Sequence, residues 1–152
     1  MHPKPVEGVS QPVVPMGPAR EMTTELTYLA WTLVLALVYI GLPSQFRTME
    51  TGTAYNAGAR DAPGPPVGKY TARLQRAQKN LFETLPLFIA AVLIAHLGGR
   101  EGWLTGWGVA LYFWARVVYL PLYALGIPYV RSLVWVVSLA GLIMVVVADL
   151  QG

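Results

Sequence analysis

The sequence contains no cysteine, few charged residues and only two histidines. Without cysteine, the chain has no disulfide framework, no thiolate nucleophile and no thiolate metal ligand. His2 and His96 stand far apart in the sequence, so we expect no metal centre. Charged residues make up 12% of the chain, against roughly 25% in a typical soluble domain. Together with a hydrophobic content of 55%, this indicates a small integral membrane protein.

At 152 residues, without an evident internal repeat, the chain is expected to form one helical unit. Its net charge of +3 is modest, and the basic residues do not form a run. This charge is better interpreted as loop charge that sets membrane topology than as a surface for nucleic acid.

The first 21 residues hold five of the twelve prolines and show no hydrophobic periodicity. Such a composition predicts a disordered tail over residues 1–21. The remaining residues, 22–152, are expected to form the transmembrane domain.

Four segments are apolar enough to span a bilayer, which requires about 20 residues for a core of about 30 Å. Pro43 is expected to end the first helix, and the Gly- and Pro-rich stretch after it predicts a loop. Only 16 uncharged residues separate Glu83 from Arg100, so the second span must include polar residues before Glu83. Arg116 likewise lies within the third span. The predicted helices cover residues 24–42, 74–97, 103–125 and 131–149.

Basic residues divide unevenly between the two sides of this four-helix topology. One side carries Lys4, Arg20 and Arg100, and the other carries Arg47, Arg60, Lys69, Arg73, Arg76, Lys79 and Arg131. By the positive-inside rule, the second side faces the cytoplasm and both termini lie outside.

Two polar stripes follow from helical spacing. Arg76, Lys79, Asn80 and Glu83 recur at i, i+3, i+4 and i+7 on the second helix, and Tyr112, Arg116, Tyr119 and Tyr123 share one face of the third. Arginine forks suit carboxylates, and a glutamate suits an ammonium group. The stripes are therefore compatible with a zwitterionic ligand that carries more than one carboxylate.

Structural interpretations of the same residues remain open at this point. Arg76 and Lys79 could be boundary anchors whose long side chains reach the headgroups. Glu83 and Arg116 could form an interhelical ion pair. Tyrosines at helix ends commonly belong to the aromatic belt at the membrane interface.

Two segments, RAQKNLFETLPLF and ARVVYLPLYALGIPYVRS, resemble the MAPEG family, the membrane-associated proteins of eicosanoid and glutathione metabolism. The likeness covers residues 22–150, and the long Pro-rich first loop is similar to that of bacterial members, which implies a bacterial cytoplasmic (inner) membrane. The resemblance implies an all-α, four-helix membrane bundle that forms a homotrimer. It also implies that glutathione, as cosubstrate, binds between subunits toward the cytoplasm.

The resemblance also implies roles for individual residues. Arg131 matches the arginine expected to stabilise the glutathione thiolate, with Tyr119 or Tyr123 as a hydrogen-bond donor to sulfur. The matching binding positions are Arg47, Arg76, Lys79, Asn80, Glu83, Arg116, Tyr119, Tyr123 and Ser132.

The leading functional hypothesis is a glutathione-dependent transferase or peroxidase that acts on a lipophilic electrophile arriving from the lipid. The main alternative is a non-catalytic membrane subunit of the same family, in which the polar cluster serves assembly. A small four-helix transporter ranks last, because residues 26–42 contain none of the acidic residues on which small multidrug exporters depend.

Overall fold

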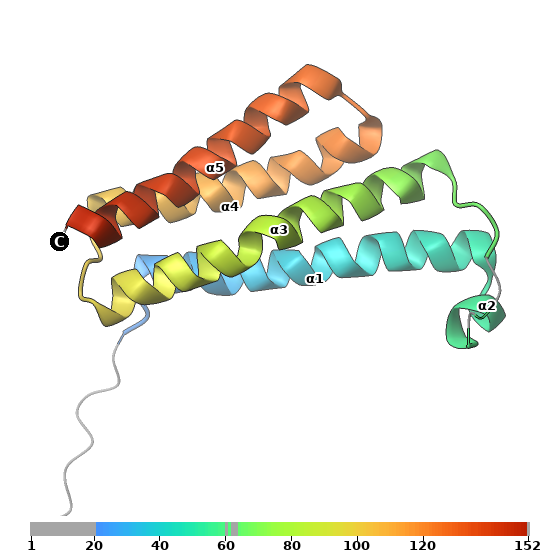
Figure 1. Cartoon of the computed structure of the whole chain (residues 1–152), viewed down its shortest axis with the longest axis horizontal. Helices are drawn as coiled ribbons and strands as arrows, with labels where there is room; N and C mark the ends of the chain where they lie inside the picture. Colours follow the sequence, from blue (N-terminus) through green and yellow to red (C-terminus); the bar gives the residue numbers. More distant parts are fainter. Residues whose placement is uncertain (1–20, 60, 62–63, 152) are drawn as a thin grey trace, which may run out of the picture.

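The computed structural model describes residues 21–59, 61 and 64–151, and within these residues it contains helices and no strand. The elements are α1 (Thr24–Thr51), α2 (Thr53–Ala57), α3 (Lys69–Leu97), α4 (Trp103–Leu125) and α5 (Pro128–Gln151). Figure 1 shows the four long helices side by side, with the short α2 at one end. The expected all-α, four-helix bundle is confirmed. The predicted disordered tail lies outside the described residues, apart from Glu21.

The four long helices are long and apolar enough to cross a membrane, with mean hydropathies between 1.4 and 2.5 over their best windows. Large apolar side chains are exposed on all four, including Leu37 on α1, Leu87 on α3, Trp107 on α4 and Leu133 on α5. A surface of this kind is stable against lipid and unstable in water. The chain is therefore an integral membrane protein.

Small residues set the distance between α4 and α5. A Cβ atom added to Gly141 would lie 2.6 Å from the carbonyl oxygen of Gly108 and 2.7 Å from the backbone nitrogen of Tyr112. Neither backbone atom has room to move away. The two helices thus approach closely because glycine occupies both positions, as is common where membrane helices pack.

The first long helix does not end before Pro43, as the sequence suggested, but continues to Thr51. Proline removes one backbone donor, and membrane helices tolerate this loss when packing compensates for it. Pro43 itself is buried against the bundle. The extension is then supported locally, because Thr48 and Thr51 donate hydrogen bonds to the carbonyls of Ser44 and Arg47. Gly52, with φ of 80°, ends the helix.

The second long helix begins at Lys69, five residues before the expected Leu74. Its first turn is capped by Glu50 of α1, whose carboxylate accepts hydrogen bonds from the Gly68 backbone and from the Thr71 hydroxyl, both at 2.8 Å. A carboxylate at a helix N-terminus satisfies unpaired amide groups and the helix dipole. As a result α1 and α3 have 28 and 29 residues, whereas α4 and α5 have 23 and 24.

The third long helix has the bounds that the sequence suggested, and the fourth begins at Pro128 instead of Arg131. Proline is well suited to the first helical position, where its missing N–H group would have no partner. Gly126, with φ of 80°, makes the turn between α4 and α5. In Figure 1 this turn lies at the same end of the bundle as α2 and the start of α3, so the two basic connections share one end.

Candidate functional site

Arg116 lies in the middle of the bundle and has no exposed surface. Its guanidinium group donates from Nη1 to the Asn80 side-chain oxygen at 2.7 Å and from Nη2 to the Thr84 hydroxyl at 2.8 Å. Hydrogen bonds that involve a charged group are stronger than neutral ones. Arg116 therefore fixes α4 to one face of α3.

Two tyrosines complete the surroundings of this arginine. The hydroxyl of Tyr112 lies 2.9 Å from that of Thr84, and the Tyr112 ring stacks on Phe88 with ring centroids 3.9 Å apart. From α1, the Tyr39 hydroxyl donates to the Arg116 carbonyl at 2.8 Å. Three helices thus meet at Arg116, which makes this position rigid.

From Arg116 a row of two adjacent rings with a cation at each end runs toward the turn between α4 and α5. The Arg116 guanidinium lies 5.4 Å from the Tyr119 ring, and Tyr119 and Tyr123 meet edge to face with centroids 5.4 Å apart. The Arg131 guanidinium then lies 4.3 Å from the Tyr123 ring. We call these four residues the Arg–Tyr row. Its members range from fully buried Arg116 to half-buried Tyr123 and Arg131, so the row connects the core to the surface.

The outer end of the Arg–Tyr row is held by Arg73 of α3. Its Nη1 atom donates to the carbonyls of Ala124 and Leu125, each at 3.2 Å, at the C-terminus of α4. A cation here complements the negative end of the helix dipole. A Cβ atom on Gly126 would collide with the Arg73 guanidinium, so this glycine allows both the turn and the contact. The start of α5, and with it Arg131, is thereby positioned.

The predicted stripe on α3 divides into two groups. Asn80 turns inward to Arg116, whereas Arg76, Lys79 and Glu83 are exposed on the outer surface of the single chain. Within the part of the chain that the structure describes, none of these three exposed residues has an ion-pair or hydrogen-bond partner. The alternative of a Glu83–Arg116 ion pair is not realised among the described residues, where the two terminal nitrogens of Arg116 bond to Asn80 and Thr84 and its buried Nε atom has no partner.

Two other predicted residues lie outside the Arg–Tyr row. Arg47 lines a groove of about 360 Å³ between α1, α2 and α3, together with Gln75 and Gln78, and its buried Nε atom has no hydrogen-bond partner among the residues that the structure describes. Ser132 follows Arg131 on α5, where its hydroxyl donates to the Pro128 carbonyl at 3.3 Å. Its hydroxyl therefore closes the first turn of the helix.

Sequence reasoning did not identify three contributors to this region: Tyr39, Arg73 and Thr84. The stripe on α3 contained a usable signal for one of them, since Arg76, Asn80 and Thr84 recur at intervals of four residues. Tyr39 and Arg73 act through backbone carbonyls of another helix, and no sequence pattern reports such contacts.

Chemically, the region offers cations with donors to spare next to phenol groups. Arg131 receives no hydrogen-bond acceptor from the residues described by the structure, whereas Arg116 has two. Such an arrangement is suited to binding and stabilising an anion. In residues 21–59, 61 and 64–151 there is no group of three or more His, Asp or Glu side chains that could hold a metal ion.

The comparisons with known proteins give one positive result. A family model described as the MAPEG family matches residues 28–150, which is most of the chain and includes all four long helices. No curated protein matches the sequence.

Proposed function

Because the chain belongs to the MAPEG family, we propose that it is a membrane enzyme that joins glutathione to a lipophilic electrophile or uses it to reduce one. Family membership itself supports a membrane function connected with glutathione, since MAPEG proteins use this tripeptide. The reaction, the roles of individual residues and the assembly are the proposal.

One observation carries the proposal: Arg131 stacks on Tyr123 at 4.3 Å and keeps its guanidinium donors available. A free thiol has a pKa near 8.5, and its thiolate is the nucleophile. A guanidinium close to the sulfur favours the charged form and lowers the pKa of the thiol. We assign this role to Arg131, with the hydroxyl of Tyr123 or Tyr119 as a further donor to sulfur.

The rest of the tripeptide would lie along the exposed part of the α3 stripe. Arg76 and Lys79 are suited to the two carboxylates of glutathione, and Glu83 to its ammonium group. Asn80 and Arg116 belong to the same site but are already bonded to each other at 2.7 Å. In a single subunit Arg116 has no exposed surface, so we propose that it acts mainly by holding Tyr119 and Asn80 in place.

In the conjugation reaction, the thiolate sulfur forms a bond to an electrophilic carbon, and the leaving group departs with the electron pair of the bond that breaks. The electrophile would arrive from the lipid. In support, a groove of about 290 Å³ between α4 and α5 is lined only by apolar and aromatic residues, among them Trp114, Val118 and Val134. A lipophilic molecule can enter such a groove without crossing water.

We further propose a homotrimer whose site is completed between subunits. Glu83 is the fifteenth residue of α3, so it lies about 21 Å along the helix and well inside the apolar span. A charged side chain exposed to lipid at this depth costs several kcal/mol. A neighbouring subunit that covers the Arg76–Glu83 face would remove this cost and bring a second wall to the bound glutathione.

The proposed orientation places this end of the bundle in the cytoplasm of a bacterial cell, with both termini outside. It is supported by the basic residues that the α3 start and the α4–α5 turn share, including Lys69, Arg73 and Arg131.

Calorimetric titration of the purified chain with glutathione, combined with conjugation to a generic aryl halide, tests the proposal. We expect millimolar or tighter binding, which Glu83→Ala weakens by about tenfold or more, and conjugation that Arg131→Ala abolishes. Lys69→Ala is the matched control, because Lys69 lies at the same end outside the stripe. Absence of glutathione binding, or full activity in both variants, would refute the assignment.

The second candidate is a non-catalytic membrane subunit of the same family. It is favoured by the observation that the two terminal nitrogens of Arg116 bond to Asn80 and Thr84, so that the polar cluster holds helices together. This candidate predicts that the wild-type chain conjugates no thiol and that Glu83→Ala disrupts the oligomer. The oligomer size of wild-type and Glu83→Ala protein, measured on the same samples, distinguishes the two candidates.

A further inference from the structure

A cavity of about 550 Å³ lies at the end of the bundle opposite to the Arg–Tyr row, between the first turns of α1 and α4. Its lining combines the carboxylates of Glu25 and Glu101 with the aromatic rings of Tyr28, Trp103 and Trp107. None of the residues assigned to glutathione contributes to it. The cavity therefore needs an explanation of its own.

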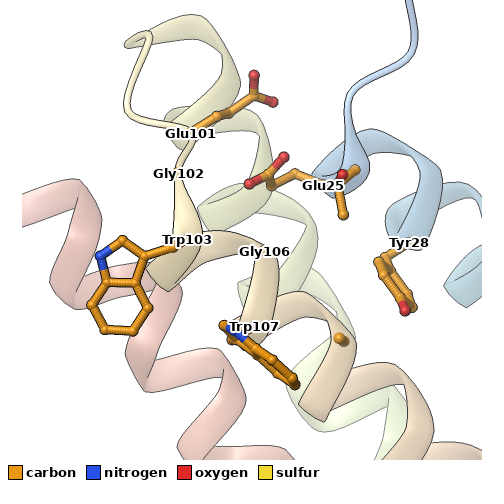
Figure 2. A pocket seen from close by; sticks show the side chains of 9 residues that line it. Glu25, Tyr28, Glu101, Gly102, Trp103, Gly106 and Trp107 are labelled. Carbon is orange, nitrogen blue, oxygen red and sulfur yellow. The ribbon is translucent and has the colours of Figure 1, made fainter.

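Glu25 is the unusual member of this lining, because only 4% of its surface is exposed. Figure 2 shows its side chain reaching from α1 toward Gly102, which precedes α4, and toward Gly106 of α4. Thr105 donates one hydrogen bond to Oε1 at 2.5 Å, and the described residues supply none to Oε2. Nor do they supply a cation, since their only ion pair within 4 Å joins His96 to Glu101.

A buried carboxylate without a counter-ion is costly, and proteins normally pair such a group. The second carboxylate of the cavity is already engaged, because Glu101 accepts from the Thr23 hydroxyl at 2.7 Å and lies 3.0 Å from His96. Glu25 is thus the group whose charge remains to be balanced by something that enters the cavity.

The aromatic residues indicate what kind of cation this is. Faces of Trp and Tyr attract ammonium groups with alkyl substituents, and recognition is strongest where a carboxylate adds its charge. The site is less suited to a metal ion, because no three side chains of the metal-binding types come together among the described residues. The position also suits an amine, since both tryptophans stand in the first turns of a membrane helix, where headgroups lie.

We propose that this cavity binds an organic ammonium group, with Glu25 as its counter-ion and Trp107 and Tyr28 as its aromatic walls. The ammonium belongs either to a free amine or to the headgroup of an aminophospholipid. Gly106 also borders the site, and a Cβ atom there would make only an ordinary van der Waals contact, at 3.8 Å, with the Glu25 carboxylate.

Saturation-transfer NMR with choline and with ethanolamine tests the site on the full chain in a maltoside detergent, which carries no amine. We expect transfer to the protons beside nitrogen, with affinity lowered about tenfold or more by Glu25→Gln. Glu21→Gln is the matched control, since Glu21 is an exposed carboxylate near the start of the same helix and does not line the cavity. Its affinity should equal that of the wild type.

Trp107→Ala provides a second variant, because Trp107 is 63% exposed and its truncation leaves the core intact. It should weaken choline binding even if Glu25→Gln fails to fold. The proposal is overturned if the wild-type protein shows no saturation transfer to either amine. It is also overturned if Trp107→Ala binds choline with wild-type affinity and Glu25→Gln, where it folds, does so too.

A lipid experiment distinguishes the two sources of the ammonium group. The protein is placed in nanodiscs of phosphatidylglycerol, with or without phosphatidylethanolamine, and choline binding is measured again. Loss of choline binding when phosphatidylethanolamine is present identifies a lipid headgroup as the occupant. Unchanged binding supports a soluble amine.

Discussion

Arg116 shows how one buried cation can be stabilised without a carboxylate. Its two terminal nitrogens bond to Asn80 and Thr84, and its faces contact the rings of Tyr112 and Tyr119. Neutral oxygens and ring faces together stabilise the guanidinium charge, which in other proteins is commonly balanced by a carboxylate. Removal of any one partner therefore leaves a buried charge less well solvated.

We expect Asn80→Ala to lower the free energy of unfolding by about 2 kcal/mol, the usual contribution of a hydrogen bond to a charged group. Thermal denaturation in detergent measures the change. Lys79→Ala is the control, because the neighbouring lysine is exposed and has no partner among the described residues, and we expect a change within about 0.5 kcal/mol. Equal stability of the two variants would contradict the geometry at Arg116.

Tyr39→Phe removes only the hydroxyl that donates to the Arg116 carbonyl. The ring stays in the core, so we expect a loss of about 1 kcal/mol, which the same denaturation experiment detects. Tyr129→Phe, at a side chain that is 88% exposed, should leave the melting temperature unchanged. A neutral Tyr39→Phe variant would mean that the hydroxyl adds nothing to the attachment of α1.

At the scale of helices, the sequence predicted those helix bounds that the length of an apolar run determines. It did not predict the bounds that side-chain caps determine. The helix over residues 103–125 has the expected bounds, because turns rich in glycine and charge flank its apolar run. The C-terminal end of α1 and the start of α3 differ from the prediction, and α3 begins earlier because Glu50 caps Gly68 across 17 residues of intervening chain. Hydropathy reports burial in lipid, and it carries no information about such a contact.

The site was predictable to a similar extent. Helical spacing grouped Arg116, Tyr119 and Tyr123 on one face, and these residues do lie in one row. Spacing could not divide the α3 stripe, because Asn80 and Glu83 are within one turn of each other and only packing decides which of them faces α4. The partners of Arg116 follow from that packing.

The Glu50 cap gives a prediction about α3. We expect Glu50→Ala to fray the first turn of the helix, at a cost of about 1 kcal/mol, because Gly68 and Thr71 lose their acceptor. Hydrogen exchange at residues 69–72 should become faster. Gln45→Ala, an exposed change on α1, is the control, and protected amides in Glu50→Ala would show that the cap is dispensable.

The contact between α4 and α5 gives a second prediction at the scale of helices. Gly141→Ala places a Cβ atom against two backbone atoms, so we expect a destabilisation of about 1–3 kcal/mol from overpacking. Gly106→Ala is a matched control, because its Cβ atom would meet only the Glu25 carboxylate, at 3.8 Å. Thermal denaturation compares them, and equal melting temperatures would argue against the close approach of the two helices.

At the scale of the whole molecule, the absence of cysteine permits a clean test of the proposed trimer. A single cysteine at Leu87, an exposed residue on the α3 face that carries Glu83, should cross-link subunits in membranes. A cysteine at Ile143, equally accessible on α5, serves as the comparison. Gel electrophoresis measures the linked fraction, and a chain that stays uncrosslinked at Leu87 would argue against an interface on this face.

The unequal lengths of the helix pairs have a consequence for the lipid that surrounds the protein. At 1.5 Å per residue, α1 and α3 exceed α4 and α5 by about 8 Å, so the longer pair projects beyond the shorter pair, which is itself long enough to cross a hydrocarbon core of about 30 Å. In a thicker bilayer, lipid would surround the projecting turns, and Lys69 and Arg73 would lie within the bilayer. Membrane thickness would therefore set how deeply these two cations lie in the bilayer.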